Sequence, residues 1–196
     1  MAEPPPSVVV LAGPNGAGKS TLAPDLLQGA LQVTEFVDAD VIARKLSPVD
    51  TQGAAITAGR EMLKRIRDLA RQGGSLAFET TLASRSFLPW LRSLTRLGYQ
   101  FHLVFLWLPS ADFAVARVAD RVRLGGHDVP EGTIRRRYAA GIRNFFGLYR
   151  PLATSWRVYD SSPGAAPRLV AYGRGRRVLG VRDRRVWNLM AQERGR

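Results

Sequence analysis

The sequence predicts a three-layer α/β fold, in which a mostly parallel central sheet carries helices on both faces. Strand-like and helix-like stretches alternate along the chain, which is the pattern of parallel strands joined by crossover helices. A glycine-rich segment, residues 13–20, directly follows the first strand and precedes a helix. The chain has 196 residues, which suffice for one domain with a full core and leave little room for a second. We expect a flexible N-terminus at residues 1–6 and a single domain over residues 7–196.

Short apolar stretches predict the strands, and apolar residues at helical spacing predict the helices. The expected strands are residues 7–12, 35–38, 75–79, 101–108 and 157–160. The stretch 101–108 is apolar almost throughout, which predicts a strand in the middle of the sheet. The first expected helix starts at Thr21. Four more are expected at about residues 54–71, 86–97, 111–124 and 131–146. Gly73 and Gly98 follow two of these helices, as glycines often do where a helix ends.

The glycine-rich segment matches every fixed position of the Walker A pattern G-x-x-x-x-G-K-[ST]. Its residues are Gly13, Pro14, Asn15, Gly16, Ala17, Gly18, Lys19 and Ser20, followed by Thr21. Glycines let such a loop fold around phosphate oxygens, so that backbone N–H groups and the next helix N-terminus point at negative charge. We expect Lys19 to reach the β- and γ-phosphates and the Ser20 hydroxyl to bind Mg²⁺. The sequence therefore predicts a P-loop NTPase fold that binds ATP and Mg²⁺.

Composition limits the partners and the compartment. With 29 Lys and Arg residues against 16 Asp and Glu residues, the net charge is +13, which attracts anions such as nucleotides and nucleic acids. The absence of cysteine excludes disulfides, thiol nucleophiles and cysteine-bound zinc. The N-terminus lacks the layout of a signal peptide, and no apolar run approaches the roughly 20 residues that cross a bilayer. We expect a cytoplasmic protein with no membrane partner.

Acidic and hydroxyl side chains follow the predicted strands at their carboxyl ends, where ligands of an open parallel sheet collect. These candidates are Asp38, Asp40, Glu79, Thr80, Thr81 and Asp160. Near a transferred phosphoryl group, a carboxylate can hold Mg²⁺ or accept a proton from the attacking hydroxyl. Asp40 could instead cap the helix that starts at Val41, so a structural and a catalytic interpretation both stay open for it. We expect Asp38 to belong to the substrate-binding group.

Two arginines on the helix predicted over residues 111–124 are candidates for contact with the γ-phosphate. Arg117 and Arg121 are four residues apart and so share a helix face. Kinases close a mobile lid whose arginines neutralise charge on the transferred phosphate. We expect such a lid at about residues 111–147, with backbone freedom at 125–126. Asp128 and Glu131 fit a capping arrangement for the next helix.

Several of these segments together resemble the short, chromosomally encoded branch of the zeta toxin family of P-loop kinases. The matching segments are residues 13–21, 36–40, 78–81, 121–130, 136–138 and 144–145. The resemblance covers about residues 7–162. Zeta toxins fold like small-molecule and nucleotide kinases, and they phosphorylate a UDP-activated amino sugar, UDP-N-acetylglucosamine in the best-known branch.

The resemblance also implies residue roles. Lys19 would hold the ATP phosphates, and Asp40 would accept the proton of the sugar hydroxyl. Glu79 would bind the substrate, assisted by Thr80 or Thr81.

For the γ-phosphate arginine, Arg121 is the first candidate and Arg117 the second, because the family's spacing to its second lid arginine is not reproduced here. The family's toxins are held in check by a small antitoxin that blocks the nucleotide site. An antitoxin is therefore a candidate partner, and action without one stays open.

Three function classes remain open at this point. The favoured class is a kinase that phosphorylates a hydroxyl of a small anionic metabolite, such as a UDP-sugar. The second is a polynucleotide or nucleoside kinase, which the positive charge would suit; nucleic acid is thus a partner that we consider but do not favour. The third is a non-catalytic, ATP-dependent regulatory module. The sequence lacks an LSGGQ-like stretch and an N-K-x-D segment, which argues against an ABC-type ATPase and a GTPase.

Overall fold

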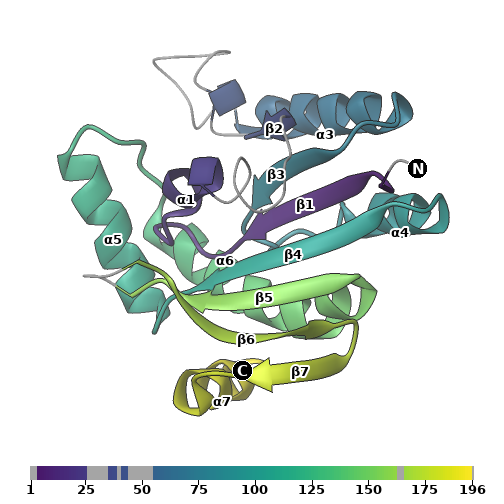
Figure 1. The fold of residues 1–196 in the computed structure, drawn as a ribbon. Coiled ribbons are helices and arrows are strands. Elements are labelled where there is room, and N and C mark those ends of the chain that lie inside the picture. The colour runs from purple at the N-terminus through teal and green to yellow at the C-terminus, as the bar shows by residue number, and fades with distance from the viewer. Residues whose placement is uncertain (1–3, 26–34, 39–40, 44–54, 163–165, 196) are drawn as a thin grey trace.

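The computed structural model describes residues 4–25, 35–38, 41–43, 55–162 and 166–195 (Figure 1). In these residues, seven strands form one sheet in the order β2-β3-β1-β4-β5-β6-β7. Neighbouring strands from β2 to β5 pair in parallel, and the β5–β6 and β6–β7 pairs are antiparallel. The predicted α/β fold with a mostly parallel sheet is confirmed.

The strands lie close to the predicted ranges and bury most of their side chains. They are β1 (Ser7–Ala12), β2 (Glu35–Val37), β3 (Leu76–Thr80), β4 (Gln100–Trp107), β5 (Ser155–Asp160), β6 (Arg168–Arg174) and β7 (Arg177–Val181). β4 lies in the middle of the sheet, as its apolar sequence predicts, and the side chains of residues 103–107 are buried. β1 is equally buried between β3 and β4. The loop after β1 therefore starts at the carboxyl end of a buried strand in the middle of the sheet.

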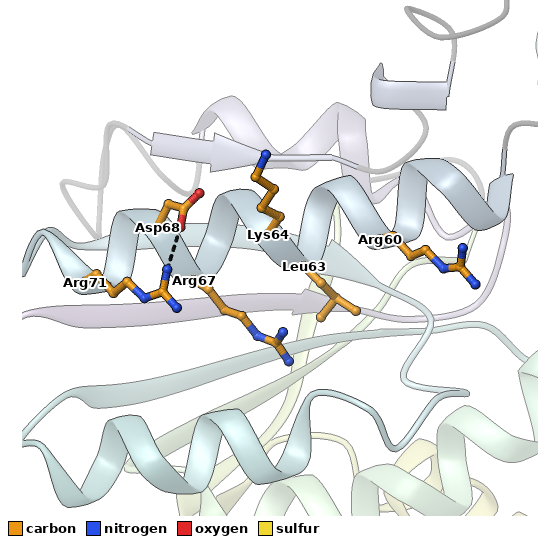
Figure 2. A pocket seen from close by; sticks show the side chains of 6 residues that line it. All are labelled: Arg60, Leu63, Lys64, Arg67, Asp68 and Arg71. Atoms are coloured by element: carbon orange, nitrogen blue, oxygen red, sulfur yellow. Dashed lines mark hydrogen bonds and ion pairs between the residues drawn. The ribbon is translucent and has the colours of Figure 1, made fainter.

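Helices pack against the sheet through apolar stripes and expose their polar sides. They are α1 (Lys19–Asp25), α3 (Ala55–Arg71), α4 (Leu88–Arg96), α5 (Ala111–Arg123), α6 (Glu131–Asn144) and α7 (Arg184–Glu193). α6 continues into a π-helical turn at Phe145–Tyr149 and a 3-10 turn at Arg150–Leu152. α4 and α6 lie behind the sheet in Figure 1, and Figure 2 shows the charged side of α3. Among the described residues, no helix combines the length and the apolar content that crossing a membrane requires.

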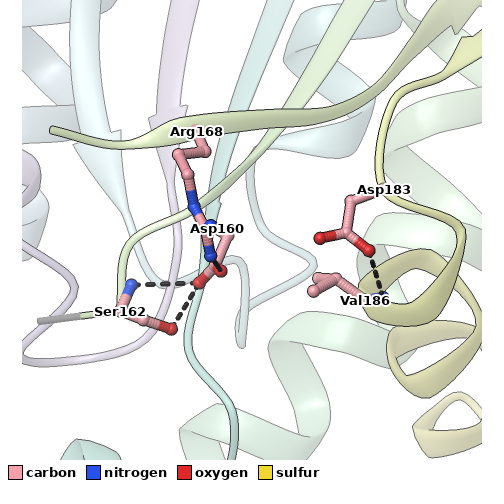
Figure 3. Close-up of polar contacts among 5 residues, drawn as sticks. All are labelled: Asp160, Ser162, Arg168, Asp183 and Val186. Carbon is pink, nitrogen blue, oxygen red and sulfur yellow. Dashed lines mark hydrogen bonds and ion pairs between the residues drawn. The ribbon is translucent and has the colours of Figure 1, made fainter. Parts of the chain in front are cut away.

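Three elements that the sequence does not predict follow β5 along the chain. β6 and β7 form an antiparallel hairpin beside β5, and α7 follows it. Arginines and glycines interrupt the apolar pattern of both strands, so a period-two alternation is hard to see in this stretch. Asp183 caps α7, because its Oδ1 accepts a hydrogen bond of 3.0 Å from the Val186 backbone N–H (Figure 3).

One predicted helix cap is wrong. The N-cap residue of α6 is Pro130, whose side chain makes no capping hydrogen bond. Asp128 Oδ1 instead accepts a hydrogen bond of 2.8 Å from the Val129 backbone N–H. The capping pattern with Glu131 fails because Asp128 lies two residues before the N-cap position.

Candidate active site

The loop between β1 and α1 has the backbone conformation of a phosphate-binding loop. Gly16 and Gly18 have φ angles of +78° and +77°, in the left-handed region that favours glycine. A Cβ at Gly16 would also lie 2.8 Å from Cβ of Arg117 on α5, so this turn is in close contact with that helix. The backbone N–H of Gly13 donates to the carbonyl of Thr80, which ties the loop to the end of β3.

Lys19 is the first residue of α1 and folds back over the loop. Its side chain is 7% exposed, and Nζ donates a hydrogen bond of 3.1 Å to the carbonyl oxygen of Pro14. The side-chain oxygen of Asn15 is buried and has no hydrogen-bond partner among the described residues. Because buried polar groups are nearly always paired, this acceptor oxygen is expected to receive a hydrogen bond from water or from a donor group. The glycine backbone angles and the Lys19 ammonium group fit a bound phosphate group.

Ser20 and Glu79 meet beside the loop, although 59 positions separate them in the sequence. Ser20 Oγ donates a hydrogen bond of 2.9 Å to Glu79 Oε2. The contact follows from the sheet, because Glu79 on β3 lies level with Leu11 on β1. Hydroxyl and carboxylate oxygens are ligands that Mg²⁺ accepts, and this ion commonly binds one or two protein groups together with phosphates and water. The described residues hold no cluster of three or more acidic, histidine or cysteine side chains, so the pair fits such a shared site rather than a cage of protein ligands.

The predicted substrate-binding residues are partly described. Asp38 directly follows β2 and is buried, and its backbone carbonyl accepts a hydrogen bond from the Ile42 N–H. Thr80 ends β3 beside the loop, and its Oγ1 accepts a hydrogen bond of 3.1 Å from the Leu82 N–H. Asp40, the predicted base, lies outside the described residues.

Thr81 contacts α6 through its backbone. A Cβ at Gly141 would lie 2.5 Å from the carbonyl oxygen of Thr81, so only glycine permits this close approach. The last residue of β3, Thr80, thus contacts the phosphate-binding loop, and the next residue, Thr81, contacts α6.

The segment after β3 is held by Asn144 and Tyr149, which have no recognisable site pattern in the sequence. Leu82 has a φ angle of +56°, a strained conformation for a residue with a branched side chain. Asn144 is buried, and its Nδ2 donates hydrogen bonds of 2.7 Å to the Leu82 carbonyl and 3.1 Å to the Ala83 carbonyl. The Tyr149 hydroxyl donates a hydrogen bond of 2.6 Å to the Ser84 carbonyl. Burial raises the pKa of Tyr149, so its hydroxyl stays a donor at neutral pH.

Removing the Asn144 amide should destabilise the protein and disturb the site. Asn144→Ala leaves two carbonyl oxygens without their donor in a buried place, which costs about 1–3 kcal/mol of unfolding free energy. Urea unfolding measures this loss. The control is Arg136→Ala on the exposed side of α6, which should stay within about 0.5 kcal/mol of the wild type. Equal stability of the two variants would contradict a role for Asn144 in holding this segment.

The two candidate arginines of α5 have different surroundings. A Cβ built at Gly18 would lie 4.0 Å from Nη2 of Arg117, so this guanidinium lies beside the phosphate-binding loop. Arg121 Nη2 donates a hydrogen bond of 2.6 Å to the carbonyl of His127 in the turn after α5. The geometry therefore favours Arg117 as the arginine nearest to a bound phosphate and gives Arg121 a contact with the turn.

The end of β5 contributes a second support for the loop. Ser161 is buried, and its Oγ donates a hydrogen bond of 2.7 Å to the Ala17 carbonyl. Ser161 is not recognisable from sequence, because a serine in a Ser-Ser-Pro-Gly loop has no distinguishing pattern.

Asp160, another carboxylate at the carboxyl edge, has its oxygens engaged in local contacts (Figure 3). Oδ1 accepts hydrogen bonds from the backbone N–H and the hydroxyl of Ser162, at 3.0 and 2.5 Å. Oδ2 lies 3.0 Å from Nη2 of Arg168 on β6. Asp160 thus fastens the antiparallel hairpin to β5, and its position at the end of a strand reflects this structural contact.

Comparison with known proteins yields a relative in sequence and several solved structures of similar fold. An uncharacterised protein of Haemophilus influenzae is 30% identical over 130 residues, which cover 66% of this chain and 91% of that protein. The solved structure of AvrRxo1-ORF1 in complex with AvrRxo1-ORF2 and ATP is similar with a TM-score of 0.71 and 15% identity. The similarity covers 94% of this chain, which spans 63% of that chain's length, less than two thirds.

A second similar structure comes from the PezAT chromosomal toxin-antitoxin system of Streptococcus pneumoniae. Its TM-score is 0.59 at 15% identity, and the similarity covers 83% of this chain and 70% of that chain. Kinases are among the other solved structures that share the fold. At these identities the likeness concerns the fold alone.

A family model gives the assignment. The model described as "AAA domain" (AAA_33) matches residues 8–140, which contain the phosphate-binding loop, Glu79 and both α5 arginines. The match spans more than half of the chain, and the sheet with its loop after β1 is the nucleotide-binding fold of P-loop kinases. The chain therefore belongs to the AAA_33 family of AAA domains and has a P-loop kinase-like fold.

Proposed function

We propose that this protein is a kinase that transfers the γ-phosphate of ATP to a hydroxyl group of a small anionic metabolite. The observation that carries the proposal is the meeting of Lys19, the Ser20–Glu79 pair and Arg117 around one phosphate-binding loop. Phosphoryl transfer needs mainly positioning and positive charge, and these groups offer both.

Each group has a role in the proposed reaction. Lys19 exchanges the Pro14 carbonyl for phosphate oxygens of ATP, and Arg117 neutralises charge on the transferred group. Ser20 and Glu79 hold Mg²⁺, which supplies further neutralisation of the phosphate oxygens. The contact with Ser20 favours this place for Glu79 over the substrate contact that the resemblance to zeta toxins implies.

The proposed transfer breaks one bond, forms one bond and moves one proton. The bond between the γ-phosphorus and the bridging oxygen of ATP breaks, and a bond to the acceptor oxygen forms. The proton of the acceptor hydroxyl passes to the carboxylate of Asp40.

We assign the acceptor to the UDP-activated amino sugars. The resemblance to zeta toxins and the fold shared with the PezAT system support this class. A net charge of +13 also favours a doubly charged nucleotide-linked acceptor. Solved structures of the same fold come from the AvrRxo1-ORF1:-ORF2 complex and from a toxin-antitoxin system, which supports an antitoxin-like partner for this chain.

A direct assay tests the function. The protein is incubated with ATP, Mg²⁺ and a panel of UDP-sugars, nucleosides and oligonucleotides, and mass spectrometry identifies which compound gains a phosphate. A phosphorylated UDP-sugar is the expected result. Phosphorylation of oligonucleotides or nucleosides alone would replace the proposed acceptor, and binding of ATP with no transfer to any compound would favour a regulatory module.

Asp40→Asn separates binding from chemistry. The variant should bind ATP with unchanged affinity in calorimetry and lose phosphoryl transfer, because its amide cannot accept the hydroxyl proton. Asp68→Asn, on the exposed side of α3, is the control and should keep full activity. Turnover retained by Asp40→Asn would remove Asp40 as the base.

The magnesium site predicts a defined metal dependence. Chelation with EDTA should abolish transfer, and re-addition of Mg²⁺ should restore it. Ser20→Ala should raise the Mg²⁺ concentration for half-maximal rate by at least about tenfold, since altered metal surroundings typically weaken affinity by such factors. Ser93→Ala on the exposed side of α4 should leave the Mg²⁺ requirement unchanged. Unaltered Mg²⁺ dependence in Ser20→Ala would place the ion elsewhere.

A further inference from the structure

A stripe of positive charge runs along the solvent side of α3, away from the phosphate-binding loop. It consists of Arg60, Lys64, Arg67 and Arg71, which together with Leu63 and Asp68 line a shallow depression of about 310 Å³ (Figure 2). At about 100° per residue, the four cations lie within an arc of about 60°, and they extend over about 16 Å of the helix. We refer to these four residues as the α3 stripe.

Packing fixes the direction of the α3 stripe. Ala58, Met62 and Ile66 are buried in the core on the other side of the helix. Rotation of α3 would expose these residues, so the cations stay directed at solvent. The packing of α3 on the core therefore determines that these four cations are exposed.

Among the described residues, most of this charge has no acidic partner. Asp68 pairs with Arg71 at 3.1 Å, and Glu35 pairs at 3.5 Å with Arg65, which lies outside the stripe. In the part of the chain that the structure describes, Arg60, Lys64 and Arg67 have no acidic partner within salt-bridge distance. With respect to the described residues, the stripe thus presents three cations that no carboxylate neutralises.

The position of the stripe separates it from the kinase site. Arg71 ends α3 shortly before β3 begins at Leu76, so this end lies at the amino edge of the sheet. The phosphate-binding loop lies at the opposite, carboxyl edge, where it contacts Thr80. An anion that extends along the whole stripe is therefore distinct from ATP bound at the loop.

A row of cations over this length suits a ligand with regularly repeated negative charge. Double-stranded nucleic acid carries one charge per about 1.7 Å of its axis, and lysine and arginine contacts to its phosphates are independent of sequence. The lining residues include no aromatic side chain on which unpaired bases could stack, which disfavours a single strand. We propose that the α3 stripe binds the phosphate backbone of a nucleic-acid duplex, without sequence preference and independently of ATP.

The test compares salt dependence in two variants. Binding of a short fluorescent DNA duplex of mixed sequence, and of its RNA equivalent, is measured by anisotropy over a series of salt concentrations. In the variant with Arg60→Gln, Lys64→Gln, Arg67→Gln and Arg71→Gln, the slope of log K against log salt should become shallower by about 0.9 for each lost phosphate contact. Glutamine is a good helix former, so α3 should persist, and unchanged ATP binding checks that the variant is folded.

The matched control removes the same charge from another surface. Its substitutions to glutamine are at the exposed residues Arg174, Arg176, Arg177 and Arg182. The control should keep a nearly wild-type slope. An equal loss in both variants, or a loss confined to the control, would overturn the proposal, because binding would then follow net charge or the β6–β7 hairpin.

Two further outcomes are decisive. A variant with the three arginines changed to lysine keeps the charge and should keep duplex binding. Tighter binding of a single strand than of the duplex, or absence of any binding by the wild type at low salt, would also overturn the proposal. Because ATP binding is measured separately, failure here leaves the proposed kinase function untouched.

Discussion

Replacing Lys19 with methionine should reduce phosphoryl transfer by at least about 10³-fold and leave the fold intact. Methionine keeps a flexible chain of similar length but removes the ammonium group that would meet the β- and γ-phosphates. Losing even one well-placed donor to a developing charge typically costs 10²–10³ in rate, and a full charge is worth more. Among the residues that the structure describes, the Lys19 side chain makes one hydrogen bond, to the Pro14 carbonyl, so the substitution removes little else.

The measurement is the rate of phosphate transfer to the acceptor found in the panel, together with the thermal unfolding midpoint. Lys64→Met is the matched control, because Lys64 is exposed on α3 and far from the loop in the sequence. It should keep wild-type turnover. Activity of Lys19→Met within tenfold of the wild type would refute the role of the loop lysine.

Arg117→Ala is expected to have the second large effect, a loss of about 10³–10⁵ in kcat of the kind that arginine fingers produce. The guanidinium lies beside Gly18, and α5 holds it there through the contact with Gly16. ATP affinity should change much less than kcat, since the charge that this arginine neutralises develops during transfer. Arg117→Lys should recover only part of the rate, because an ammonium group lacks the planar fork of donors.

The companion variant Arg121→Ala distinguishes the two arginines. It removes the hydrogen bond to the His127 carbonyl and should loosen the turn after α5, with a smaller effect on kcat than Arg117→Ala. The reverse order of effects would restore Arg121 as the γ-phosphate arginine and would mean that α5 or its turn moves when ATP binds. Single-turnover rates at saturating ATP provide the comparison.

The parts of the fold that local pattern encodes were predictable. The apolar content of residues 101–108 predicts a buried central strand, and β4 is that strand. The Walker A spacing predicts the loop after β1, because left-handed backbone angles require glycine at particular positions, and Gly16 and Gly18 adopt them. The hairpin of β6 and β7 was not predictable by the same means, since its arginines and glycines hide the alternation of buried and exposed positions.

The candidate site, like the fold, was predictable only in part from the sequence. The rule that ligands collect at the carboxyl edge brings Asp38 and Glu79 into consideration from sequence alone. It also selects Asp160, whose carboxylate is engaged by Ser162 and Arg168. Strand ends can be located from a pattern, but the partner of a carboxylate depends on the segment that folds against it.

By itself, the sequence determined the class of the fold, the phosphate-binding loop and the edge of the sheet at which the site lies. The tertiary structure alone decided that Ser20 meets Glu79, that Arg117 lies beside the loop, and that Asn144 holds the segment after β3. It also decided that Arg121 donates a hydrogen bond to the His127 carbonyl. The physical reason is that periodicity and glycine spacing record local backbone geometry and burial. The direction of a polar side chain is set by partners tens of residues away, which meet it only once the sheet and its helices have packed.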